Sequence, residues 1–156
     1  MKKVFLFLSL IVATISTQAQ YTGYTPWENC FGKNASCNNY GCSAIEVNTS
    51  SSSPIIAIVK KYGKVVKHAY ISKSSSYTFQ LKDGTYQVFF YHGNFWDRNK
   101  KIKSDECNSI YGGFSEGEAV TKDDPIKLSN QVMTYTLIPT SNGNFNTKSS
   151  SLSEAL

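Results

Sequence analysis

After its first twenty residues, the sequence has no apolar run long enough to cross a bilayer, which takes about 20 residues in a helix. The formal net charge is only +5, and the lysines do not form the basic face or helix of a nucleic-acid-binding protein. The chain also lacks an acidic calcium loop. We therefore expect no membrane span after residue 20, no nucleic-acid partner and no cofactor.

The N-terminal segment has the order of a secretory signal peptide. Lys2 and Lys3 form a positive start, residues 4–15 are almost entirely apolar, and Thr17-Gln18-Ala19 offers small residues around a cleavage site. The apolar run is too short for a membrane-spanning helix. We predict cleavage after Ala19 and a secreted or periplasmic protein. Because no cysteine stands at or just after this point, a lipid anchor is not expected.

Four cysteines follow this segment, and an even number in an exported chain predicts two disulfide bonds. Cys37 and Cys42 are close enough to close a small loop, although four cysteines allow three pairings. The remaining pair, Cys30 with Cys107, would tie the N-terminal region to the second half of the chain. A zinc site is the alternative, but such sites favour two tight C-x2-4-C pairs, which this spacing does not provide. We expect disulfides and no metal.

Short strands with turn signals between them predict an all-β fold. Residues 43–48 form a short strand with Ile45 and Val47 on one face. Residues 55–59 are apolar and mostly β-branched, which favours a buried strand. Residues 65–71 form the return strand after a glycine-containing loop.

The strongest local pattern is a predicted hairpin across Asp83-Gly84, which is a two-residue type I′ turn signal. Residues 77–81 and residues 85–91 flank this turn with apolar residues at alternate positions. The turn would place six apolar side chains on one side of the sheet, with Leu81 opposite Tyr86, Phe79 opposite Val88 and Tyr77 opposite Phe90. Because the register given by the turn agrees with the burial pattern, we predict a paired hairpin in the core.

The remaining residues have weaker patterns. Residues 92–130 predict one long, irregular loop, and residues 131–138 alternate again and predict a strand. The polar residues after 140 predict a loosely held tail, with a short edge strand at residues 144–147 as an option. We find no repeat and no helix. We expect a cysteine-containing arm at residues 20–42, one small β-sandwich at residues 43–140 and a polar tail at residues 141–156.

Residues 55–91 resemble known domains. The pattern Phe79-x-Leu81-x-x-Gly84-x-Tyr86-x-Val88 resembles a hairpin of carboxypeptidase-regulatory-like and prealbumin-like β-sandwich domains, and Gly63-Lys64-Val65-Val66 is similar to the turn and strand before it. Flanking motifs resemble a group of exported bacterial proteins of unknown activity: Thr25-Pro26-Trp27-x-x-Cys30, His68-Ala69-Tyr70-Ile71 and Asn142-Gly143-Asn144-Phe145. The resemblance implies a prealbumin-like or immunoglobulin-like sandwich that serves as a binding module rather than an enzyme, and it carries no site residues.

Aromatic residues are the leading candidates for a binding surface. Trp27 lies in the arm, and Phe95, Trp96 and Tyr111 lie in the long loop. If a disulfide joins these segments, their rings would form one platform, and flat rings beside amide and carboxylate groups suit sugar or peptide binding. The alternative is that the rings fill a small second core under the loop.

Other polar residues support weaker hypotheses. His68 and His92 lie in or at the end of predicted strands, where a packing or surface role is favoured over catalysis. The acidic residues are interpreted as solvated loop charges, with calcium binding or paired catalytic carboxylates as alternatives: Asp105, Glu106, Glu116, Glu118, Asp123 and Asp124. We interpret two groups of basic residues as aids to solubility, with binding of anionic glycans or lipid phosphates as the alternative. These are Lys60, Lys61, Lys64 and Lys67, and Arg98, Lys100, Lys101 and Lys103.

We therefore hypothesise an exported, non-enzymatic binding module whose working surface is the arm together with the loop after residue 91. Its ligand would be an envelope or extracellular partner, with a glycan as one candidate. Two alternatives remain open at this stage. One is a cell-wall or glycan hydrolase that uses loop carboxylates or a histidine, and the other is a secreted inhibitor or immunity-like protein that blocks a partner's cleft.

Overall fold

The computed structural model describes residues 20–38, 40–50, 52–137 and 147–156. The predicted signal peptide, residues 1–19, lies outside the described residues. Within the described residues the chain forms nine strands and two four-residue helices. In chain order these are α1 (Glu28–Phe31), β1 (Cys42–Thr49), β2 (Ile55–Lys61), β3 (Lys64–Ile71), β4 (Ser76–Lys82), β5 (Gly84–Ile102), β6 (Ile110–Lys122), β7 (Ile126–Leu128), β8 (Val132–Leu137), β9 (Lys148–Ser150) and α2 (Leu152–Ala155).

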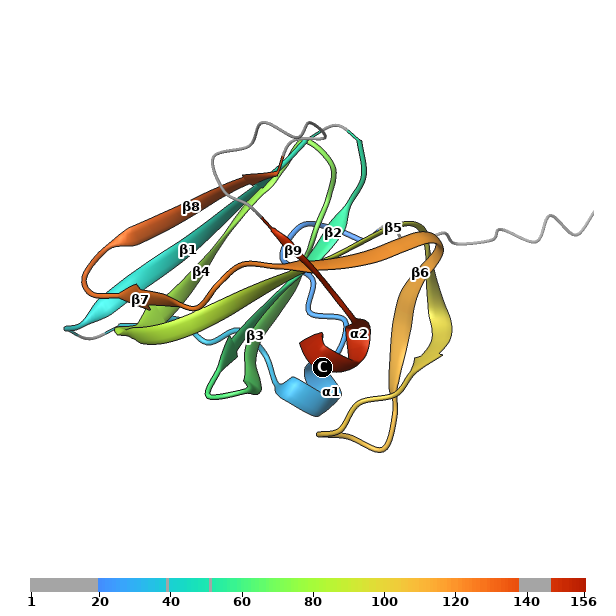
Figure 1. The fold of residues 1–156 in the computed structure, drawn as a ribbon, viewed down its shortest axis with the longest axis horizontal. Coiled ribbons are helices and arrows are strands. Elements are labelled where there is room, and N and C mark those ends of the chain that lie inside the picture. The colour runs from blue at the N-terminus through green and yellow to red at the C-terminus, as the bar shows by residue number, and fades with distance from the viewer. Residues whose placement is uncertain (1–19, 39, 51, 138–146) are drawn as a thin grey trace, which may run out of the picture.

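The strands form two packed sheets, which confirms the predicted all-β sandwich. The small sheet has the order β4-β1-β8, in which β1 runs antiparallel to β4 and parallel to β8. The large sheet has the order β3-β2-β5-β6-β9, and β7 pairs with the start of β5. Figure 1 shows the small sheet on the left, while the long strands β5 and β6 continue to the right, away from it.

The hairpin of β2 and β3 forms as predicted. Lys61 pairs with Lys64, so Tyr62 and Gly63 make a two-residue loop with φ angles of +52° and +77°. Type I′ loops require positive φ at both central positions, which glycine adopts freely and tyrosine adopts at a cost.

The predicted pairing of residues 77–81 with residues 85–91 is wrong. β4 pairs with β1 in the small sheet, whereas β5 pairs with β2 in the large sheet, so Asp83 connects two sheets instead of two neighbouring strands. The burial pattern nevertheless holds, because Phe79 from β4 and Val88 from β5 belong to the same core. Alternation fixes which side of a strand is buried, and it is satisfied equally by a neighbouring strand and by a strand across the core.

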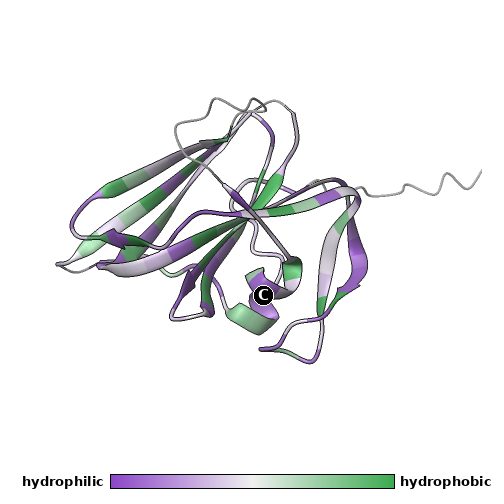
Figure 2. Cartoon of the chain, in the orientation of Figure 1, coloured by the Kyte–Doolittle hydropathy of each residue, from purple (hydrophilic) through white to green (hydrophobic). Residues whose placement is uncertain are grey.

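The inner core lies between the sheets and takes alternate residues from each strand. β1 contributes Ile45 and Val47, as predicted, and β8 contributes Tyr135. Figure 2 shows the resulting bands of apolar and polar residues along the strands of the small sheet, whose other face is open to solvent. Val132 and Thr134 lie on that outer face, which confirms the predicted two sides of the last strand.

The large sheet is buried on both faces at β2, which explains the unbroken apolar run in this strand. Residues 55, 57 and 59 face the inner core, while Ile56 and Ile58 face a second apolar cluster on the opposite side. We call this second cluster the outer core, and its buried members are Trp27, Ile56, Ile58, Val65, Tyr70, Phe89, Tyr91, Ile102, Ile110, Phe114, Val120, Ala155 and Leu156. A strand with two buried faces needs apolar residues at every position, and such a run gives no alternation.

The prediction of one irregular loop over residues 92–130 is wrong. β5 continues to Ile102, β6 runs back from Ile110, and β7 follows. Their register shifts twice, between His92 and Asn94 and between Asp97 and Lys101. At the first shift β6 carries one extra residue and at the second β5 carries two, and these irregularities interrupt the regular pattern that would reveal the strands in the sequence.

The prediction of a loosely held tail is also wrong for the described residues 147–156. β9 pairs with β6, and the final residues Ala155 and Leu156 are buried in the outer core. The Ser151 side chain accepts a hydrogen bond from the Glu154 backbone N–H and caps α2. The optional edge strand at residues 144–147 falls mostly on residues outside the described part. The arm is irregular as predicted, apart from α1.

Candidate functional site

The candidate functional site is the part of β5 and β6 beyond the body of the sandwich, residues 94–102 and 110–117. We call this part the extension. Trp96 pairs across it with Phe114, and their ring centroids are 5.3 Å apart. The same Trp96 ring meets the ring of Tyr70 from β3 at 5.9 Å. The inner side of the extension therefore packs onto the outer face of the large sheet.

Both predicted disulfides are present. Cys30 at the end of α1 joins Cys107, which lies between β5 and β6, with a Cα–Cα distance of 6.1 Å. Cys37 joins Cys42 at the start of β1 with a Cα–Cα distance of 5.9 Å. The first bond fastens the arm to the connection at the tip of the extension. The four thiolates of the alternative zinc site are therefore consumed.

Trp27 fills the space between the arm and the extension. Its ring stacks on His68 at 5.6 Å, and its Nε1–H donates to the Gly112 carbonyl at 3.0 Å. Only 2% of the residue is exposed. Gly112 has a φ of +103°, and a Cβ there would lie 2.6 Å from the Trp96 ring, so only glycine fits. Trp27 therefore belongs to the second core that the sequence analysis kept as an alternative, and it does not line a binding surface.

The outer side of the extension carries two exposed rings. Phe95 is 71% exposed and Tyr111 is 57% exposed, while Trp96 between the two sides is half-buried. Of the four predicted binding residues, the structure thus leaves Phe95 and Tyr111 open to a partner. Trp96 packs against Tyr70 and Phe114, and Trp27 is buried in the outer core.

Phe95 has an exposed ring on a left-handed backbone, with a φ of +52°, and unlike Tyr62, which has the same φ in a two-residue loop, it lies inside a strand. It lies between the two register shifts of β5, where the strand bends. A bulky residue at positive φ costs on the order of 1 kcal/mol, and exposure of the ring returns none of it. Backbone strain that no packing offsets is more frequent at functional sites than elsewhere.

Two of the acidic residues singled out in the sequence, Glu118 and Asp123, bind structural partners. Glu118 accepts a hydrogen bond from the Tyr91 hydroxyl and forms an ion pair with Lys100 at 2.5 Å. Burial and the Glu118 carboxylate both raise the pKa of Tyr91. Asp123 accepts a hydrogen bond from the Tyr135 hydroxyl at 3.0 Å. These contacts do not form the pair of free carboxylates across a cleft that glycoside hydrolysis requires.

Both histidines are held by their surroundings. His68 is fully buried, and its Nε2 accepts the Trp27 backbone N–H at 3.1 Å. The Nε2 atom of His92 lies 3.2 Å from the Thr121 hydroxyl, within hydrogen-bond distance. Burial lowers the pKa of His92. Neither contact joins a histidine to an acidic residue. The preference for a packing role over catalysis therefore fits their positions.

Burial of His68 predicts a loss of stability in mild acid. It lowers the His68 pKa from 6.5 to about 4, so the folded protein keeps the ring neutral while the unfolded chain protonates it near pH 6.5. Its contribution to stability is complete above pH 6.5 and falls as the pH approaches 4, by up to roughly 3 kcal/mol. Urea unfolding between pH 7.5 and 4.5 measures this loss, which His68→Phe should largely remove. An equal slope in both proteins would contradict it.

Within the described residues, no group of three or more histidine, cysteine, aspartate or glutamate side chains could hold a metal ion. None of the helices in the described part of the chain is long and apolar enough to span a membrane.

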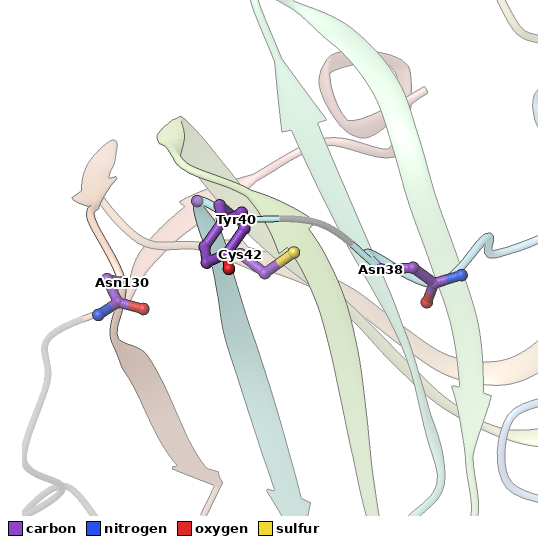
Figure 3. A pocket seen from close by; sticks show the side chains of 5 residues that line it. Asn38, Tyr40, Cys42 and Asn130 are labelled. Carbon is purple, nitrogen blue, oxygen red and sulfur yellow. The ribbon is translucent and has the colours of Figure 1, made fainter.

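Pockets surround the Cys37–Cys42 loop on another part of the surface, which the sequence analysis did not single out. One has a volume of about 540 Å³, and Figure 3 shows Asn38 and Asn130 at its two ends, with Tyr40 and Cys42 between them. A second, of about 360 Å³, lies under residues 35–38 of the arm. Residues of the arm and of the sandwich line these pockets together, so they could not be predicted from the sequence. Only some of their lysines had been noted there, as part of a basic group.

No protein-family model, curated protein or solved structure matches the chain. The resemblance to prealbumin-like domains therefore stays a prediction, while the strand pairing itself establishes the two-sheet fold.

Proposed function

We propose that this is an exported, non-enzymatic binding protein that recognises a protein partner of the envelope or extracellular space through the outer side of the extension. The exposed ring of Phe95 on a left-handed backbone inside a strand, where no turn requires that conformation, carries the proposal. Such a residue adds little to the fold, whereas an aromatic ring that becomes buried on binding contributes strongly to affinity. Two disulfides support the predicted secreted or periplasmic location, because such bonds persist in oxidising compartments.

The shape of the extension favours a protein partner. Phe95 and Tyr111 stand on two paired strands that the outer core supports, so binding would order few additional groups. Asp97, Arg98 and Lys101 are exposed beside them. An apolar centre with a polar and charged rim is the usual composition of a protein interface.

Photo-crosslinking in the producing cell tests this proposal. A benzoylphenylalanine at position 95 or 111 should form an adduct with one protein of defined mass. Position 62 is the matched control, because Tyr62 is also an exposed aromatic residue, at 89%, and has the same φ of +52°. Equal adducts from position 62, or none from positions 95 and 111, would contradict the proposal. If the protein instead binds a glycan and this binding depends on Phe95, the ligand of the extension is a sugar and the proposed protein partner is wrong.

Phe95→Gly should separate binding from folding. Glycine relieves the strain of the left-handed backbone in the folded state, but it also increases the conformational entropy of the unfolded chain. Because these effects oppose each other, the free energy of unfolding should change by less than about 1 kcal/mol. Binding of the cross-linked partner should fall at least about tenfold, because a central interface ring is lost. Calorimetry and urea unfolding measure the two effects.

Tyr62→Gly makes the same backbone change at the other exposed, left-handed aromatic residue. It should match Phe95→Gly in stability and keep full binding. A loss of several kcal/mol in Phe95→Gly alone would show that Phe95 serves the fold and would remove the main support for the proposal.

A further inference from the structure

The sandwich has an open side between its edge strands, β3 in the large sheet and β4 in the small sheet. Residues 35–38 of the arm contribute to a pocket of about 360 Å³ that residues of both strands also line. The apolar wall of this pocket is the end of the inner core, formed by Val66, Leu81 and Tyr86. We call it the strap pocket. It does not include the exposed rings of the extension.

The arm is fastened over this pocket at both sides. The Cys37 backbone N–H donates to the Gln80 side chain of β4 at 3.2 Å, and the Cys37–Cys42 disulfide fixes the same residue to β1. The Lys67 ammonium of β3 donates to the Ala35 carbonyl. The pocket is thus preformed, which reduces the entropy lost on ligand binding.

Positive charge lines the strap pocket without any carboxylate. Lys61, Lys67 and Lys82 contribute to its lining, and none of the three forms an ion pair within the described residues. Burial lowers the pKa of Lys67. Asp83 follows Lys82 in the chain, but within the described residues it forms no ion pair with these lysines, and its carboxylate accepts hydrogen bonds from the Ser43 hydroxyl and the Asn130 backbone N–H.

We propose that the strap pocket binds a small organic anion that has an apolar body, with a carboxylate, phosphate or sulfonate at one end. The lysines would hold the anionic group, and the body would lie against the Tyr86 ring and the side chains of Val66 and Leu81. Lys61 already lies 5.1 Å from the centroid of the Tyr86 ring, so charge and aromatic surface meet at one point. The volume lies within the range of about 300–1,000 Å³ that is typical of small-molecule sites.

Two fluorescent probes with the same aromatic body test the ligand class. 1-Anilinonaphthalene-8-sulfonate should bind at least about tenfold more tightly than the uncharged N-phenyl-1-naphthylamine, because only the former offers charge-assisted contacts. Octanoate and octyl phosphate should displace it, and the tighter competitor identifies the head group. Equal affinity for both probes, or equal displacement by inorganic phosphate alone, would overturn the proposal.

Lysine variants locate the site. Lys67→Gln and Lys82→Gln should each weaken binding of the sulfonate probe by about fivefold to tenfold. Lys64→Gln is the matched control, because it removes the same charge from an exposed position outside the pocket lining, and it should weaken binding less than about twofold. Lys67→Arg, which keeps the charge, should retain most of the affinity. Equal losses in all three glutamine variants would indicate general attraction by net charge and would contradict the site.

Discussion

Replacing both Cys30 and Cys107 by alanine is expected to lower the free energy of unfolding by about 4 kcal/mol, whereas replacing Cys37 and Cys42 should lower it by about 2 kcal/mol. The difference follows from sequence separation, which is 77 residues for the first pair and 5 for the second. A longer closed loop removes more conformations from the unfolded chain. The long-range bond also fixes α1 to the connection at the tip of the extension.

Urea unfolding of the two double variants, followed by circular dichroism, measures this difference. Each variant replaces two cysteines and loses one disulfide, so each is a control for the other. A loss of equal size in both would show that chain entropy does not determine the effect. The Cys37→Ala/Cys42→Ala variant should also weaken probe binding in the strap pocket, because it frees the arm on one side.

Much of the inner core could be predicted from the sequence. Alternation in β1 and β8 identifies the buried side of each strand, and the unbroken apolar run in β2 identifies a fully buried strand. The two disulfides followed from the number and spacing of the cysteines. The alternation, the apolar run and the Cys37–Cys42 spacing are local signals, whereas Cys30–Cys107, 77 residues apart, followed only as the remaining pair.

The partner of β4 could not be predicted in the same way. Asp83-Gly84 signals a tight connection, and alternation on both sides agrees with a paired hairpin. The chain instead crosses between the sheets here, and Gly84 has a φ of +155°. A turn motif predicts that the chain changes direction. Whether the two flanking strands then pair in one sheet or face each other across the core depends on the other strands of the fold.

The candidate site was predicted only in part. Phe95 and Tyr111 are exposed, as a binding surface requires, but Trp27 is buried because the extension folds over it. This contact joins residues 85 positions apart, and the register shifts of β5 hide the strands that make it. The strap pocket was missed for a similar reason, since the arm and two edge strands form it together.

Trp27→Ala is expected to lower the free energy of unfolding by about 3–5 kcal/mol, because a large, fully packed ring would leave a cavity. The ring is 2% exposed, stacks on His68 and Tyr91, and donates to the Gly112 carbonyl. Its loss would leave that carbonyl unpaired and would separate the arm from the extension. Thermal and urea unfolding measure the effect.

Trp96→Ala is the internal control, because Trp96 is the only other tryptophan and is only half-buried. It should cost less than about half as much, since less apolar surface is lost. Trp27→Ala should also couple to the Cys30–Cys107 disulfide. Both join the arm to the extension, so the combined variant should lose less than the sum of the two separate losses. Additive losses, or a greater cost for Trp96→Ala, would show that the extension is held independently of the arm.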